Sequence, residues 1–173
     1  RRVLAGERDL GVLAEGLDDT DRLILASTLR RLCAAAEDWQ GTVEAAQALI
    51  ALGAGDADTW AALAGARANL GDEAAAAEAY AQAVALAPEQ AMLRRNYADA
   101  LIKLKRLDEA AAQLDAAEKL EPDAPYLALR RAQLAQAAGD RAAALRWAEE
   151  ALRPRPGWDE AERMLGNGRT ADG

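Results

Sequence analysis

Three prolines at a constant spacing constrain the fold of this chain more than any other feature. Pro88, Pro122 and Pro156 lie 34 residues apart, and each closes a segment of similar pattern. A fixed period of this length indicates one structural unit that is copied along the chain. The sequence therefore predicts an array of repeats, with clear units at 57–90, 91–124 and 125–158.

Each unit contains two helical patterns separated by a turn. In the first unit, Trp60, Leu63 and Ala64 have the spacing of one helix face, and Gly71–Asp72 interrupts the pattern. Glycine can adopt the left-handed conformation that ends a helix, and aspartate can cap the next helix. A second apolar pattern then runs to Pro88, which cannot continue it. The prediction is an all-α fold built from helix–turn–helix units.

The composition supports this fold and excludes two classes of function. Hydrophobic residues make up 51% of the chain but aromatic residues only 4%, so alanine dominates the apolar content and favours closely packed helices. The formal net charge is −8, which argues against a nucleic-acid-binding surface because such a surface needs a basic footprint. No apolar run reaches the ~18 residues of a membrane-spanning helix, so no direct membrane insertion of this segment is predicted.

Helix–turn–helix units of this length, with this pattern of small and large residues, resemble the tetratricopeptide repeat family. The first unit carries the family pattern most fully, at Trp60, Leu63, Ala64, Gly71, Ala76, Tyr80, Ala83 and Pro88. The resemblance implies a right-handed α-solenoid whose concave side is lined by the first helix of each unit, helix A. Three residues depart from the pattern and are expected to weaken packing contacts: Arg67, Lys105 and Arg131.

The N-terminal part of the chain follows the same register less clearly. Residues 23–56 are predicted to form a degenerate repeat, in which Ala54 stands where the closing proline is expected. Residues 1–22 are predicted to contain a helix from Glu7 to Leu17, followed by a polar turn at Asp18–Asp21. The chain does not begin with methionine, which favours a piece of a longer protein.

At the C-terminal end, apolar residues indicate the start of one more helix A. Residues 159–167 are expected to form a short capping helix, which would cover the apolar face of the last repeat. Residues 168–173 are expected to be a disordered tail.

The family resemblance also implies which side chains face a ligand, because ligands of these repeats contact a recurring set of positions on helix A. Carried onto this sequence, those positions give the candidate partner-binding residues Arg31, Asn69, Arg95, Asn96, Asp99, Lys103, Tyr126, Arg130 and Gln133. The charged groove positions comprise four cations (Arg31, Arg95, Lys103 and Arg130) and two carboxylates (Asp58 and Asp99). A cationic groove on an acidic protein favours an acidic partner segment. The alternative is a set of ordinary solvated side chains.

A catalytic role is not predicted for this segment. The chain has no histidine, which removes the commonest general base and the commonest zinc ligand, and it lacks nucleophile and phosphate-binding motifs. Its single cysteine, Cys33, is expected to be a buried small residue. No catalytic residue, metal site or cofactor is therefore assigned.

The predicted function is non-catalytic protein–protein recognition, in which a peptide or helical segment of another protein binds in the concave groove. One alternative is a regulatory or sensing module of a larger enzyme or multiprotein assembly, and another is self-association, so the oligomeric state is left open. The alanine-rich composition with more Arg than Lys is typical of bacterial proteins. The default compartment is the cytoplasm, or the periplasm if an upstream anchor or signal was removed.

Overall fold

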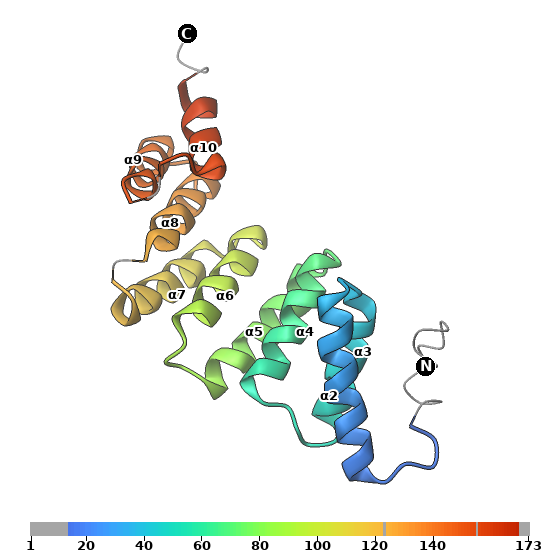
Figure 1. Ribbon diagram of the computed structural model, residues 1–173. Coiled ribbons are helices and arrows are strands. Elements are labelled where there is room, and N and C mark those ends of the chain that lie inside the picture. Colours follow the sequence, from blue (N-terminus) through green and yellow to red (C-terminus); the bar gives the residue numbers. More distant parts are fainter. Residues whose placement is uncertain (1–13, 123, 155, 170–173) are drawn as a thin grey trace. The chain divides into compact units, whose positions relative to one another are not determined.

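Every regular element in the described part of the chain is an α-helix (Figure 1). The computed structural model describes residues 14–122, 124–154 and 156–169. The helices are α2 (Asp19–Ala35), α3 (Trp39–Ala51), α4 (Ala57–Asn69), α5 (Glu73–Leu86), α6 (Ala91–Lys103), α7 (Leu107–Leu120), α8 (Pro125–Ala137), α9 (Arg141–Leu152) and α10 (Asp159–Arg169). The predicted all-α class is confirmed.

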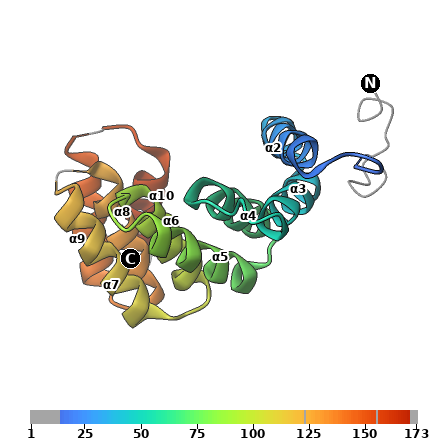
Figure 2. The ribbon, with the colours of Figure 1, turned by 90° about the horizontal axis from the view of Figure 1, so that it is seen from below.

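The chain divides into two compact units, Arg1–Pro88 and Glu89–Gly173. The N-terminal unit contains the helical hairpins α2–α3 and α4–α5, and the C-terminal unit contains α6–α7 and α8–α9 followed by α10 (Figure 2). In the described residues, no helix combines the length and apolarity needed to cross a membrane.

Aspartate side chains cap the N-terminal ends of five of the described helices. Asp18, Asp38, Asp56, Asp72 and Asp140 each accept a hydrogen bond from the backbone N–H three residues later, at 2.8 to 3.2 Å. Such a cap satisfies one of the N–H groups that the first turn of a helix leaves without an intrahelical partner. These residues therefore set where the helices start.

The turn inside each hairpin uses a left-handed residue at the same place in the repeat. These residues are Glu37, Gly71, Lys105 and Gly139, with φ between 55° and 83°. Glycine adopts this conformation without steric cost, whereas Glu37 and Lys105 are forced into it by the helices on either side. Lys105, which departs from the family pattern, thus keeps the turn geometry of the glycine it replaces.

Two predicted boundaries are wrong. Asp19–Asp21, predicted as part of a polar turn, form the first turn of α2, because Asp18 caps this helix and acidic residues suit a helix N-terminus. Most of the predicted helix at Glu7–Leu17 lies outside the described residues, which begin at residue 14. Residues 14–16, at the end of that predicted helix, form a turn. At the other end, α10 continues to Arg169, beyond the predicted capping helix; residues 170–173 of the predicted tail lie outside the described residues.

Alanine forms most of the core of the N-terminal unit. Ala45, Ala46, Ala64, Ala76 and Ala83 are fully buried. Small side chains allow the paired helices to approach closely, as the composition predicts. Cys33 is half-buried, not fully buried as expected.

The core of the C-terminal unit is built around leucines set among alanines. Leu101 and Leu114 are fully buried and pack with Leu127 and several alanines of α6 and α7. A second cluster forms around Leu129 and Ala161, with Trp147 and Trp158 packed against it. Leu129 is fully buried, and α10 supplies part of the cluster that buries it.

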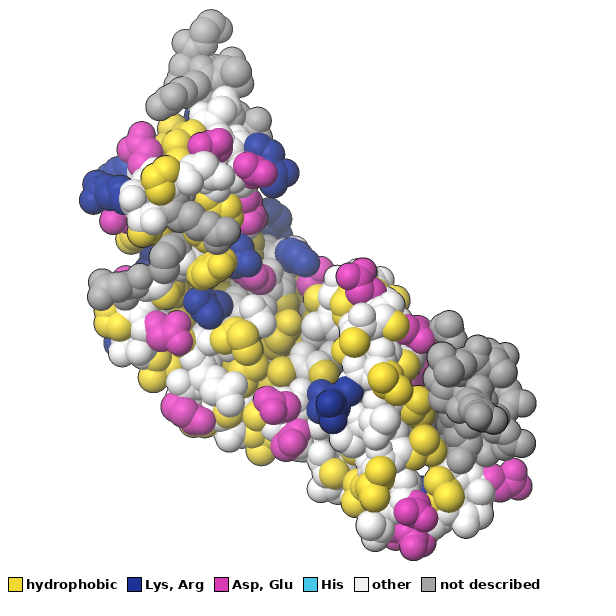
Figure 3. Space-filling model, viewed as in Figure 1, with side chains coloured by type: hydrophobic (Ala, Val, Ile, Leu, Met, Phe, Trp, Pro, Cys, Tyr) yellow, Lys and Arg dark blue, Asp and Glu magenta, His cyan; other side chains and the backbone are white. Residues whose placement is uncertain are grey.

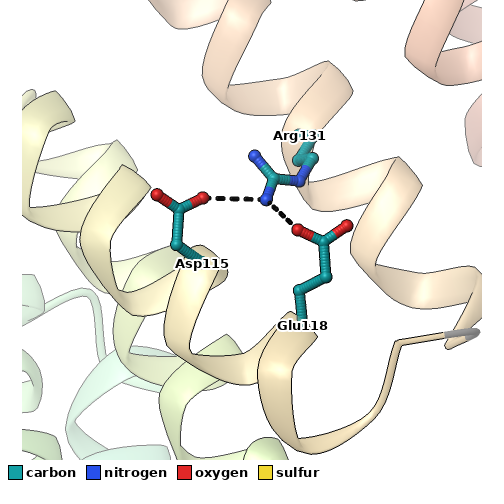
Figure 4. A network of polar contacts seen from close by, with 3 residues as sticks. All are labelled: Asp115, Glu118 and Arg131. Carbon is teal, nitrogen blue, oxygen red and sulfur yellow. Dashed lines mark hydrogen bonds and ion pairs between the residues drawn. The ribbon is translucent and has the colours of Figure 1, made fainter.

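Arg131 stabilises the packing of the C-terminal unit, contrary to the expectation that it weakens a contact. One terminal nitrogen of its guanidinium lies 2.8 Å from Asp115 Oδ1 and 2.7 Å from Glu118 Oε2, both on α7 (Figure 4). The guanidinium also lies 5.3 Å from the centre of the Trp147 ring on α9. An arginine can form ion pairs and stack on an aromatic ring at the same time, so this side chain of α8 contacts both α7 and α9.

Candidate binding face of the C-terminal unit

A polar pocket opens between the first helices of the repeats in the C-terminal unit. Its volume is about 610 Å³. It is lined by α6, the turn after α6, α8 and α10, through Asp99, Ile102, Lys103, Lys105, Arg130, Gln133, Gln136, Ala137 and Glu160. Charged side chains of both signs are interleaved over this unit, and neither sign forms one large patch on the face in view (Figure 3). The residues that line the pocket include three cations (Lys103, Lys105 and Arg130) and two carboxylates (Asp99 and Glu160).

A network of side chains joins the three helices around this pocket. Arg130 Nε lies 2.6 Å from Asp99 Oδ1, and both side chains are about three-quarters buried. Arg130 also donates a hydrogen bond to Gln133 Oε1 at 3.2 Å, and Gln133 Nε2 donates to Glu160 Oε1 at 2.6 Å. The Arg130 guanidinium is thus engaged within the chain, and the network connects α6, α8 and α10.

The Asp99 carboxyl has an unusual proton affinity because of where it lies. Burial raises its pKa from 3.8 to about 6, and nearby Glu160 adds to this rise. The cations Arg130 and Lys103 oppose the rise by favouring the charged carboxylate. At neutral pH, Asp99 is therefore mostly ionised and paired with Arg130, but it accepts a proton in mildly acidic solution.

This raised pKa predicts a particular pH dependence of stability. Between about pH 4 and pH 6, folded Asp99 holds a proton that the unfolded chain has released, so its contribution to stability falls as pH rises. The loss of unfolding free energy is at most about 3 kcal/mol, because the pKa of Asp99 differs by about two units between the folded and the unfolded chain. Urea unfolding of the wild type and Asp99→Asn at about pH 4.5 and pH 7 measures it, since the variant lacks this titration. Identical pH dependence in both proteins would contradict the prediction.

A second feature of the same helices is a partly exposed aromatic cluster. The Arg95 guanidinium lies 5.7 Å from the centre of the Tyr126 ring, and the Tyr126 ring meets the Trp158 ring edge-to-face at 5.0 Å. Arg95 Nη1 also lies 3.7 Å from Glu121 Oε2. Met92, one turn before Arg95 on α6, is 53% exposed, and Tyr126 is 46% exposed. We call Met92, Arg95, Tyr126 and Trp158 the aromatic edge.

Most of the predicted partner-binding residues come together on the first helices of the C-terminal unit. These residues are Arg95, Asn96, Asp99, Lys103, Tyr126, Arg130 and Gln133. The other two, Arg31 and Asn69, belong to the N-terminal unit, where Arg31 is exposed on α2 and the Asn69 amide donates to the Gly65 carbonyl at 2.8 Å.

Two charged residues of the polar pocket were not among the sequence-based candidates. Lys105 lies in the turn after α6, just beyond the helix positions that the family pattern assigns to ligands. Glu160 lies in α10, at the register position of Met92 and Tyr126 in the preceding repeats. Extending the repeat register into the capping helix would have identified Glu160.

In the described residues, no group of three or more acidic or cysteine side chains could hold a metal ion.

Comparison with known proteins agrees with the helical repeat. Residues 69–134 match the family model described as tetratricopeptide repeat. Over these residues the chain is similar to tetratricopeptide repeats. No curated protein sequence matches the chain.

Solved structures share the fold of this repeat chain at low sequence identity. MamA from Desulfovibrio magneticus RS-1 superposes with a TM-score of 0.76 at 16% identity, covering 87% of this chain and 85% of that one. YrrB, described as a TPR protein with an unusual peptide-binding site, gives 0.74 at 15% identity, covering 89% and 87%. The first TPR of Spaghetti (RPAP3), bound to the HSP90 peptide SRMEEVD, gives 0.61 at 22% identity, covering 67% and 92%.

Proposed function

We propose that this chain is a non-catalytic interaction module whose C-terminal unit binds an acidic peptide segment of another protein. The binding surface is the face formed by α6, α8 and α10. Two of the structural neighbours are described with a peptide-binding site or a bound peptide, and the peptide bound by Spaghetti contains three acidic residues. Those descriptions support peptide recognition as the function of this fold.

The observation that carries the proposal is the position of Lys103 and Lys105 in the polar pocket. Both side chains are exposed, at the end of α6 and in the turn after it, and both line the pocket. An acidic segment can therefore approach the two lysines from solvent. Exposed cations beside a pocket attract carboxylates and set the orientation of a partner more than they set affinity.

The charge-reversal variant Lys103→Glu/Lys105→Glu tests this proposal. We expect it to lose partners that the wild type captures from a lysate of the source organism, as identified by mass spectrometry. The matched control is Lys119→Glu/Arg153→Glu, which makes the same change in net charge at exposed residues outside the polar pocket. An unchanged list of partners for the pocket variant, or equal losses for both variants, would contradict the proposal.

A further inference from the structure

On α6 and α8, the two lysines of the polar pocket and the aromatic edge lie toward opposite ends of the helices. Met92 and Tyr126 lie in the first turns of α6 and α8. Lys103 ends α6 and Lys105 follows it, while Gln136 lies in the last turn of α8. All of these residues belong to the C-terminal unit. One face of this unit therefore changes from apolar and aromatic to cationic along the helix direction.

The aromatic edge is held in place by its own contacts while part of it stays exposed. The Tyr126 ring contacts the Trp158 ring edge-to-face and the Arg95 guanidinium, so it loses little freedom when a partner binds. Met92 adds a flexible apolar side chain from the same register position in the preceding repeat. Single exposed apolar residues are common on protein surfaces, but Met92 and Tyr126 share one register position in successive repeats, and Arg95 lies one turn after Met92 and faces the Tyr126 ring. Exposed apolar side chains placed in this way suit an apolar anchor residue of a partner.

We infer that this face binds an extended peptide in one orientation, with an apolar anchor on the aromatic edge and a carboxylate at Lys103 and Lys105. Lys103 lies eleven positions after Met92 on α6, which corresponds to ~16 Å along the helix axis. An extended segment covers that distance in about five residues. The partner therefore carries an apolar residue and an acidic residue about five positions apart. The acidic half of this inference rests on the proposed function.

An extended partner fits this face better than a helix does. The bonds from Asp99 to Arg130 and from Gln133 to Glu160 connect the three helices between the two ends of the face. They occupy space between the helices, which favours a narrow extended chain over a helix of ~10 Å diameter. A helical partner would instead need about eleven residues between its anchor and its carboxylate.

Selection of random 12-residue displayed peptides on the wild-type chain tests the inference. We expect enriched peptides to contain Leu, Met or an aromatic residue about five positions from Asp or Glu. A spacing near eleven, no preferred spacing, or enrichment of acidic residues alone would overturn the inference. No enrichment over the starting library would also count against it.

Single variants then separate the two ends of the face. For an enriched peptide, Tyr126→Ala is expected to weaken binding at least about tenfold, as loss of an aromatic anchor does. Leu32→Ala is the matched control, because Leu32 is a similarly exposed apolar residue (56%) on α2 of the other unit. Circular dichroism of each variant checks that it is folded.

The outcomes also distinguish this inference from the proposed function. If Tyr126→Ala binds as tightly as the wild type while Lys103→Glu/Lys105→Glu does not bind, the acidic recognition holds and the oriented two-ended recognition is wrong. If neither variant changes binding, both the inference and the proposed function fail for that peptide class.

Discussion

Leu114→Ala is expected to lower the free energy of unfolding of the C-terminal unit by about 2 to 5 kcal/mol. Leu114 is fully buried at the centre of the cluster that joins α6, α7 and α8. Four of the six other buried residues of this cluster are alanines, which have no side-chain rotamers that could turn into the cavity. We therefore expect a loss in the upper half of this range, because the cost grows with the cavity that remains.

Urea unfolding followed by circular dichroism measures this loss. Leu120→Ala is the matched control, since it removes the same atoms from the same helix at a residue that is 42% exposed. The control should change stability far less than Leu114→Ala does. Equal losses in the two variants would show that α7 does not form the core contact described here.

The second large effect is expected from Arg130→Ala, which should lower the free energy of unfolding by about 3 kcal/mol at neutral pH. The substitution leaves the Asp99 carboxylate three-quarters buried and without the cation that faces it at 2.6 Å. It also removes the donor to Gln133. The pKa of Asp99 is expected to rise further, because burial already raises it and Arg130 is the main influence that lowers it.

Two comparisons make this prediction specific. Arg106→Ala breaks an arginine–carboxylate pair of similar length, with Glu109, that is exposed on both sides, so it should change stability little. The double variant Arg130→Ala/Asp99→Ala should recover part of the stability that Arg130→Ala loses, because it removes the unpaired carboxylate as well. If Arg130→Ala were no more harmful than Arg106→Ala, the pair in the pocket would have no structural role.

The positions of the hairpin turns were predictable because they depend on local chemistry. Gly71 and Gly139 mark two of these turns, and the constant repeat length places the other two at Glu37 and Lys105. The error at Asp19–Asp21 shows the limit of local reasoning. A run of acidic residues suits both a turn and the start of a helix, and the sequence pattern alone did not show that Asp18 caps α2.

The candidate binding residues were predictable as a group, but not by their roles. The family pattern selected Arg130 and Asp99 as two separate groove charges, whereas the structure pairs them and links them to Gln133. These residues lie on different helices. Their pairing depends on how the helices pack and on which rotamers fit, and the spacing of residues in the sequence does not specify either one.

The sequence by itself determined the repeat length and the helical fold, because these follow from periodic apolar residues, turn residues and caps. Only the tertiary structure decided that Arg131 is a packing residue, that α10 takes part in burying Leu129, and that Lys103 and Lys105 are the exposed cations of the pocket. The physical reason is that a side chain's charge partner and its burial are set by neighbours distant in sequence. Those neighbours come together only when the helices pack.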